Sequence, residues 1–170
     1  MARQPRCALP PHGVYHVTAR GVERRAIFID DDDRRLFVAL IELAAQRHRW
    51  QIPAYCLLTN HIHVVVKASL AQLSRGMHLL IGRYAQNFND RYDRVGHLFQ
   101  GRFHARAVTD DDYLATVCDY VLDNAVRAGL CRSRDEWPWL GGYARAWTGE
   151  SAGAQEQSGE TSPLEPFSLR

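Results

Sequence analysis

The sequence has no apolar run long enough to span a membrane, and residues 1–13 lack the apolar stretch of a signal peptide. We therefore expect a protein of the cytoplasm with no membrane partner. The four cysteines are widely spaced and form no Cys-x-x-Cys motif, which argues against a disulfide framework and against a zinc knuckle. A reducing compartment suits this cysteine usage.

Lysine is nearly missing, because Lys67 is the only one and arginine supplies the rest of the positive charge. The planar fork of arginine suits bidentate phosphate contacts and base stacking better than an ammonium group does. The charge is also uneven. Residues 75–106 hold six arginines against two aspartates, whereas residues 150–170 hold four glutamates against one arginine.

Length and composition predict one globular domain with a short tail. At 170 residues and 46% apolar content, the chain can bury a real core. Residues 151–162 are polar and contain no aromatic residue. We therefore expect a single domain over 1–149 and a flexible tail over 150–170.

Periodicity predicts the order strand, helix, strand, strand, helix, strand, helix. This order favours an α+β fold with a ferredoxin-like βαββαβ core, a mostly antiparallel sheet and helices on one face. After Gly129 we expect a C-terminal extension in which residues 137–139 cover a sheet edge. The expected strands span 13–20, 50–58, 61–67 and 103–108. The first expected helix begins after Asp30–Asp33 and ends at about 47–49, and the other two span 70–91 and 110–124.

Two histidines stand at alternate positions of the third predicted strand. His61 and His63 would point to the same side, with Cα atoms roughly 6–7 Å apart. Both imidazoles could therefore bind one divalent metal ion. The alternative at this point is a pair of strand histidines that only make hydrogen bonds.

A tyrosine and an asparagine lie one turn apart on the third predicted helix. Tyr120 and Asn124 are adjacent on its surface and share a flank with Tyr113, beside an apolar stripe that would pack on the sheet. The helix could thus aim a phenol and an amide at the sheet. Tyr113 and Tyr120 could equally be half-buried core aromatics with solvated hydroxyls.

Several stretches together resemble the REP-associated branch of the single-tyrosine HUH transposases. The similarity covers about residues 12–145, and the stretches occur in the family's order. The sequence differs at three positions: Val22 stands where relatives often have asparagine, and Thr59 and Ala125 stand where they usually have proline. The matching stretches are Tyr15-His16-Val17-Thr18-Ala19-Arg20-Gly21, Leu57-Leu58-Thr59-Asn60-His61-Ile62-His63-Val64-Val65, Leu73-Ser74-Arg75-Gly76-Met77, Arg83-Tyr84-Ala85-Gln86, Gly96-His97-Leu98-Phe99-Gln100-Gly101-Arg102-Phe103, residues 119–129 and Trp137-Pro138-Trp139.

The resemblance implies a metal-dependent endonuclease and strand transferase for single-stranded DNA. Tyr120 would be the nucleophile, His61 and His63 the metal ligands, and Asn124 a third ligand for Mg²⁺ or Mn²⁺. Attack on phosphorus would give a 5′-phosphotyrosine and free a 3′-hydroxyl. The implied partner is DNA with imperfect palindromic REP hairpins, so we expect a nucleoid-associated monomer or homodimer.

The distribution of arginines predicts where DNA lies. We expect a basic track leading to Tyr120, with Phe99 or His97 available for base stacking and a second basic turn at the end of the first strand. An ordinary solvated helix face is the alternative. The track comprises Arg83, Arg94, Arg102 and Arg106, and the turn comprises Arg20, Arg24 and Arg25.

Two other functions remain open from the sequence. A catalytically silent protein that binds DNA hairpins would need the same surface without the chemistry. A metal-free RNA phosphoesterase of the 2H type would use two His-x-Thr arms. His16-Val17-Thr18 provides one arm, but the second arm has His63 where threonine is needed.

Overall fold

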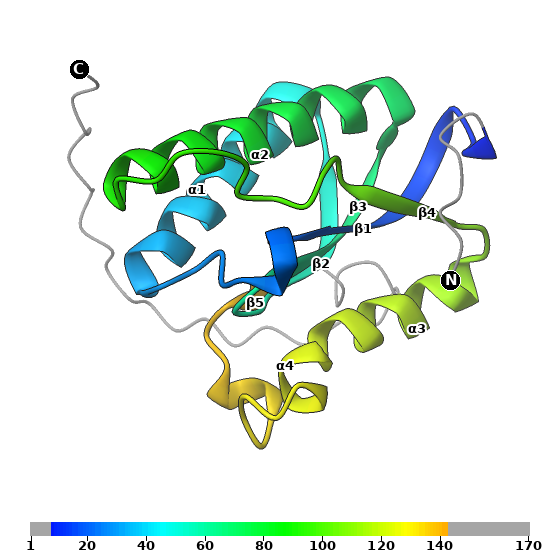
Figure 1. Ribbon diagram of the computed structural model, residues 1–170. Coiled ribbons are helices and arrows are strands. Elements are labelled where there is room, and N and C mark those ends of the chain that lie inside the picture. Colours follow the sequence, from blue (N-terminus) through cyan, green and yellow to red (C-terminus); the bar gives the residue numbers. More distant parts are fainter. Residues whose placement is uncertain (1–7, 143–170) are drawn as a thin grey trace, which may run out of the picture.

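The computed structural model describes residues 8–142, without the side chains of residues 111 and 112. A five-stranded antiparallel sheet in the order β4-β1-β3-β2-β5 forms its centre (Figure 1). The strands are β1 (His12–Arg20), β2 (Gln51–Leu57), β3 (His61–Ser69), β4 (His104–Val108) and β5 (Leu140–Gly141). The helices are α1 (Asp31–His48), α2 (Leu70–Arg91), α3 (Asp111–Leu122) and α4 (Asn124–Arg127), with 3-10 turns η2 (Val22–Arg24) and η3 (Arg134–Glu136).

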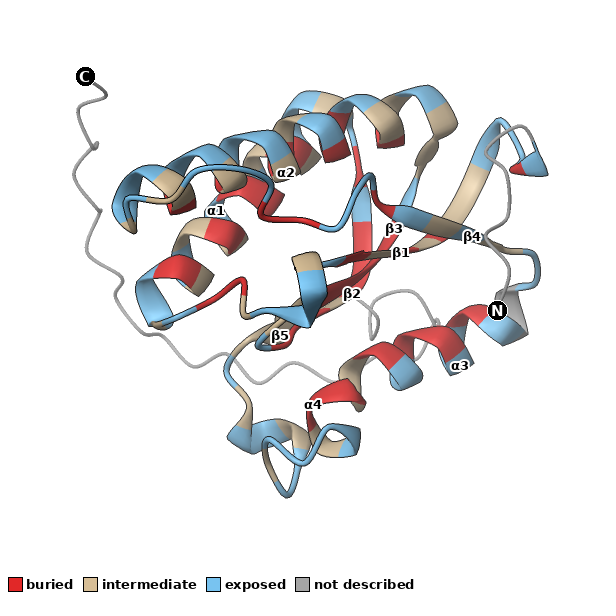
Figure 2. Cartoon of the chain, in the orientation of Figure 1, coloured by how far each residue is buried: buried red, intermediate tan, exposed pale blue. Residues whose placement is uncertain are grey.

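The predicted α+β class and ferredoxin-like core are confirmed, but the helices do not lie on one face. α1 and α2 cover one side of the sheet, and α3 covers the other (Figure 1). The reason lies in β3, where every residue from Ile62 to Val66 is buried. Side chains of a strand alternate between faces, so a continuous buried run requires cover on both. Figure 2 shows this burial along the strands and on the helix sides that face them.

The third predicted helix is divided into two. α3 ends at Leu122, and Asn124 begins the separate turn α4. Arg134 holds this junction, because its Nη1 donates to Asp119 Oδ1 at 3.0 Å and its Nε donates to Asp123 Oδ1 at 2.6 Å. The other boundaries fall within a few residues of those expected from the sequence.

The C-terminal extension covers the outer edge of β2. Leu57 N donates to Trp139 O at 2.8 Å, and Trp137 Nε1 donates to Leu57 O at 3.1 Å. β5 then pairs with β2. The predicted tail over 150–170 and the end of the predicted domain from residue 143 lie outside the described residues. Within residues 8–142, no helix is both long and apolar enough to cross a membrane.

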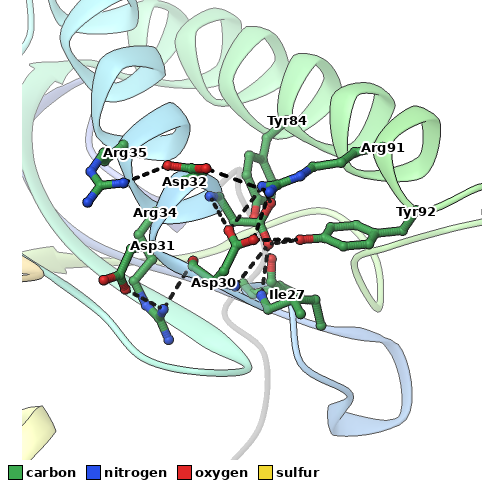
Figure 3. Close-up of polar contacts among 11 residues, drawn as sticks. Ile27, Asp30, Asp31, Asp32, Arg34, Arg35, Tyr84, Arg91 and Tyr92 are labelled. Carbon is green, nitrogen blue, oxygen red and sulfur yellow. Dashed lines mark hydrogen bonds and ion pairs between the residues drawn. The ribbon is translucent and has the colours of Figure 1, made fainter.

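Polar contacts join the start of α1 to the end of α2, and Figure 3 shows those of Asp30 with Arg91 and Tyr92. A buried carboxylate, that of Asp33, makes further contacts there. Asp33 is 2% exposed and belongs to a capping box with Asp30. Its Oδ2 accepts hydrogen bonds from Ile29 N at 2.8 Å and from the Tyr92 hydroxyl at 2.9 Å. Its Oδ1 accepts from Arg91 Nη1 at 2.8 Å. A buried charge with several donors locks the two helices into one layer.

We expect Asp33→Ala to lower the free energy of unfolding by about 1–3 kcal/mol, because the Ile29 amide and the Tyr92 hydroxyl lose their main acceptor, whereas Arg91 keeps its two hydrogen bonds to Asp30. Urea denaturation monitored by circular dichroism measures the loss. The matched control is Asp32→Ala, since the Asp32 side chain is 68% exposed and should contribute less than about 1 kcal/mol. Equal losses in the two variants would contradict the role assigned to Asp33.

Candidate active site

Three histidines lie together on the face of the sheet that α3 covers. His61 and His63 alternate along β3, and β1 pairs beside it with Thr18 opposite His63 and Arg20 opposite His61. His16 therefore shares this face. Its ring centroid lies 5.1 Å from that of His63, which in turn lies 5.0 Å from that of His61. Strand alternation and pairing bring together imidazoles that are far apart in the sequence.

The turn between β2 and β3 orients the first imidazole. Asn60 Nδ2 donates to Arg24 O at 2.9 Å, so the Asn60 oxygen is the atom that lies 2.7 Å from His61 Nδ1. Because an amide oxygen only accepts, His61 Nδ1 carries the proton. The lone pair of His61 therefore resides on Nε2, where a ligand or a proton can be bound.

Gly21 allows the basic turn to pack against this hairpin. A Cβ atom at Gly21 would lie 2.2 Å from Arg25 O, so only glycine fits there. Gly21 N donates to Asn60 O and Ile27 N donates to Thr59 O, both at 2.9 Å. Arg24, which we expected to contact DNA, is exposed on this turn, and Asn60 links it to the histidines.

His16 orients the second imidazole. His16 Nε2 lies 2.9 Å from His63 Nδ1, and their rings are stacked with an interplanar angle of 20°. One of these two nitrogens must carry a hydrogen for the contact to be favourable. If His63 Nδ1 is the donor, its Nε2 lone pair is available, which matches the arrangement at His61.

The three imidazoles are held neutral. Burial lowers the pKa of His16 to about 4, with a further contribution from the charge of Arg106. Burial also lowers the pKa of His61 to about 4, aided by Arg20. The pKa of His63 falls to about 3 through burial and then through His16, His61 and Arg20. Neutral imidazoles keep the lone pairs that metal coordination or proton acceptance requires.

Tyr120 lies over these rings. Its ring centroid is 6.0 Å from that of His16 and 6.0 Å from that of His63, in edge-on arrangements. Tyr120 remains 41% exposed, whereas Val117 and Val121 of the same helix are buried against the sheet. The phenol thus faces both the histidines and solvent.

Arg127 also contacts the ring of Tyr120. Its Cζ lies 5.3 Å from the Tyr120 ring centroid, in cation–π contact. Asn124 Nδ2 donates to Tyr120 O at 2.8 Å and Asn124 is 8% exposed. Since carbonyl oxygens only accept, the amide nitrogen must be used there, which leaves Oδ1 as the atom able to coordinate an ion.

No group of three or more His, Cys, Asp or Glu side chains is arranged to hold a metal ion in residues 8–142. Cys56 is opposite His63 in the sheet, but burial raises the pKa of its thiol to about 11. It is therefore a protonated core residue rather than a thiolate ligand. An ion at this site would need His61, His63 and oxygen ligands from an amide, solvent or substrate.

The arginines expected to form one track lie on two faces. Arg106 is opposite His16 in the sheet and belongs to the face of Tyr120, whereas Arg83 belongs to α2 on the other face. Arg94 packs over Phe88 of α2 at 5.5 Å. The predicted track therefore does not lie on one face, because α2 and α3 pack on opposite sides, and its contact with DNA stays a prediction.

Phe99, one of the two residues named for base stacking, is buried. It is 5% exposed and its ring centroid lies 6.3 Å from that of Tyr84, within the core under α2. The loop is folded inward at this residue, so Phe99 exposes little surface for a base, whereas His97, the other residue named for stacking, is exposed. Arg20 and Arg102 are exposed and line a hollow of about 220 Å³ next to the histidines.

The sequence profile of the family described as transposase IS200 like matches residues 12–124, well over half of the chain. The chain belongs to the IS200-like transposases. The match includes every residue that forms the candidate site except Arg127.

A search of solved structures shows which folds this IS200-like chain resembles. It is similar to the structure of a REP-associated tyrosine transposase bound to a REP hairpin, with 16% identity, a TM-score of 0.66, and coverage of 99% of this chain and 100% of that one. A provisionally assigned transposase of Deinococcus radiodurans R1 matches at 14% identity and TM-score 0.47, over 71% and 95% of the two chains. A search of curated proteins found no significant match.

Sequence reasoning missed two residues at this site. His16 was named only in the first matching stretch and in one arm of the phosphoesterase alternative, although the ferredoxin-like strand order places β1 beside β3 and could have indicated its position next to His63. Arg127 follows Tyr120 by seven residues, which would be two turns of one continuous helix. The break at Asp123 could not be foreseen from that spacing.

We expect the metal-free protein to lose stability as the pH falls from about 6.5 toward 4. The three histidines have folded pKa values of about 4, 4 and 3, below the unfolded value of about 6.5. The unfolded chain therefore binds protons first, and stability that is present above pH 6.5 is lost below it. Urea unfolding across this pH range in EDTA measures the slope.

His63→Leu should make this pH dependence shallower, because the histidine with the lowest pKa is gone. Proton NMR of the imidazole signals provides an independent measurement. Titration of all three site histidines near pH 6.5 in the folded protein would contradict their burial as neutral groups.

Proposed function

We propose that this transposase cuts and rejoins single-stranded DNA beside a hairpin, with Tyr120 as the nucleophile. The observation that carries the proposal is the position of an exposed phenol 6.0 Å, centroid to centroid, from two neutral imidazoles, the half-buried one of His16 and the buried one of His63. A core aromatic would have no reason to remain 41% exposed over polar rings. Family membership agrees with this chemistry.

The reaction is a phosphoryl transfer. Tyr120 Oη bonds to phosphorus, the bond from phosphorus to the 3′ oxygen breaks, and the phenol proton is lost while the leaving oxygen gains one. The products are a 5′-phosphotyrosine and a free 3′-hydroxyl. Reversal with a different 3′-hydroxyl rejoins the strand, so the bond energy is kept in the ester and no ATP is needed.

His61 and His63 would hold a divalent ion, Mg²⁺ or Mn²⁺, with Asn124 Oδ1 as a third ligand. Such an ion neutralises charge on the scissile phosphate and orients it for in-line attack. The fit rests on the donor set: Asn60 fixes the proton of His61 on Nδ1, and His16 contacts His63 at Nδ1. Both Nε2 lone pairs can thus be directed to one ion.

The basic residues around the site would bind the DNA backbone. Arg20 and Arg106 act on the histidines through their charges, so the electrostatic potential at the site is positive. Arg24 and Arg102 extend this charge over the neighbouring surface. The similar solved structure holds a REP hairpin, and we propose an imperfect palindromic hairpin of this kind as the partner here.

Tyr120→Phe should abolish cleavage and the covalent adduct, because only the attacking hydroxyl is removed. Hairpin affinity should change by no more than a few-fold. The measurement is denaturing gel electrophoresis of protein incubated with labelled hairpin DNA and Mn²⁺. Tyr113→Phe is the matched control, since Tyr113 is 53% exposed on the same helix and should leave the adduct unchanged. An adduct formed by Tyr120→Phe would move the nucleophile elsewhere.

His61→Ala and His63→Ala should each abolish cleavage, because two imidazoles form most of the protein's ligand set. Asn124→Ala should only raise the Mn²⁺ concentration needed for half-maximal cleavage. Binding of uncut hairpin should persist in all three variants. Cleavage by the wild-type protein that is insensitive to EDTA would exclude the metal role, and an unchanged Mn²⁺ requirement in Asn124→Ala would exclude that ligand.

A further inference from the structure

Arg127 places a positive charge beside the proposed nucleophile. Its Cζ lies 5.3 Å from the centroid of the Tyr120 ring, and both side chains are exposed. Arg127 ends the short helix α4, which follows α3 directly (Figure 1). Helical side chains lean toward the N-terminus, so an arginine roughly 10 Å of helix beyond Tyr120 extends back toward it. The cation and the phenol are therefore both open to a substrate.

The carboxylate one turn before Arg127 is paired with a different arginine. Asp123 stands at the spacing at which an aspartate and an arginine attract each other along a helix. However, Arg134 Nε donates to Asp123 Oδ1 at 2.6 Å. The pKa of Asp123 is lowered mainly by this hydrogen bond to Arg134, and the charge of Arg127 is the smallest contribution. Arg134 thus occupies the acid that would otherwise draw Arg127 away from Tyr120.

The guanidinium of Arg127 keeps its donors available. Within residues 8–142, Arg127 forms no ion pair, and its side chain contacts the ring of Tyr120. A cation–π contact at an exposed site is weak, so the guanidinium can leave the ring for a stronger acceptor. A phosphate is such an acceptor, because it can receive two parallel hydrogen bonds from one arginine.

The proposed reaction brings a phosphate to this position. Tyr120 Oη bonds to phosphorus while the bond from phosphorus to the 3′ oxygen breaks, the phenol gives its proton to solvent, and the 3′ oxygen takes up a proton. The phosphoryl group carries one negative charge before and after this transfer. It carries more during the transfer, because the phenol proton has left before the 3′ oxygen receives one. A cation next to Oη therefore binds the transition state more tightly than the uncut strand.

We propose that Arg127 is a further catalytic residue, which donates hydrogen bonds to the non-bridging oxygens of the phosphoryl group as it passes to and from Tyr120. The proposal rests on the proposed function for the reaction itself. It is distinct from DNA binding by the other arginines, because Arg127 contacts the phosphate that reacts rather than the rest of the strand. The predicted effect is therefore on the rate of the reaction and not on the affinity for DNA.

Arg127→Gln should slow formation of the Tyr120 adduct at least about 10-fold when labelled imperfect-hairpin DNA saturates the protein in Mn²⁺. This loss is smaller than the roughly 100-fold loss typical of a donor shielded from solvent, because Arg127 is exposed. Affinity for the uncut hairpin, measured in EDTA by fluorescence anisotropy, should change by less than about 2-fold. Denaturing gels of samples quenched over time give the rate. Arg132→Gln is the matched control, because it removes the same charge from an exposed residue after α4 and should keep both values.

Two further variants separate catalysis from a structural role. Arg127→Lys should recover part of the rate, because it keeps the charge without the two parallel hydrogen bonds. Guanidinium chloride, well below denaturing concentrations, should accelerate Arg127→Ala more than the same concentration of sodium chloride does, because the free cation can take the vacated position. The proposal is overturned if Arg127→Gln reacts as fast as the wild type, or if the loss appears only in hairpin affinity. A loss of rate that neither lysine nor guanidinium repairs also overturns it.

The wild-type protein separates this proposal from the proposed function. If the wild type forms the Tyr120 adduct and Arg127→Gln forms it equally fast, only the assignment of Arg127 is wrong. If the wild type binds the hairpin but forms no adduct in Mn²⁺, the proposed function fails and the assignment of Arg127 fails with it.

Discussion

The pairing of β3 between β1 and β2 is the constraint on which the site depends. Side chains alternate along a strand, so a shift of one residue would exchange every side chain between the two faces. In the observed register Ile62, Val64 and Val66 enter the core under α1 and α2, and His61 and His63 face α3. Burial of the valines therefore fixes the direction of the histidines. The hydrophobic core and the chemistry of the site are specified by the same pairing.

α3 covers only part of the second face of the sheet, and the uncovered part carries the candidate site. α3 packs on the sheet through Leu114, Val117 and Val121, against apolar residues such as Val65. The histidines continue this face beyond the apolar cluster, where Tyr120 remains partly exposed. Arg134 pairs with Asp119 and Asp123 on either side of Tyr120. This pairing holds the end of α3, so it positions the phenol without lying in the site.

Much of this arrangement could be predicted from local pattern. The strand alternation at His61 and His63, the capped helix after Asp30 and the Thr59–Asn60 turn each depend on a few neighbouring residues. Thr59 stands where relatives usually have proline, yet the turn forms, because the contact it makes uses the Thr59 carbonyl, which accepts from Ile27 N. A proline would retain that carbonyl. The substitution therefore leaves the essential hydrogen bond intact.

What could not be predicted depends on long-range packing. Arginine content indicates a basic protein but does not say which face each arginine occupies, so Arg83 was grouped with Arg106 although a sheet separates them. Phe99 was expected to be available for base stacking because it lies in a loop that mixes glycines, aromatics and positive charges. Phe99 instead points inward and packs near Tyr84 in the core under α2.

The electrostatics of the site explain why a phosphodiester suits it. Burial is the main cause of the low pKa values of the three imidazoles, and the charges of Arg20 and Arg106 contribute to them, so the region around these two arginines is electropositive. The same region favours an anion. A phosphate bound there would offset the arginine charges and would interact most strongly where solvent is excluded. A bound DNA strand would reduce the repulsion between the positive charges at the site, so substrate binding would also stabilise the folded protein.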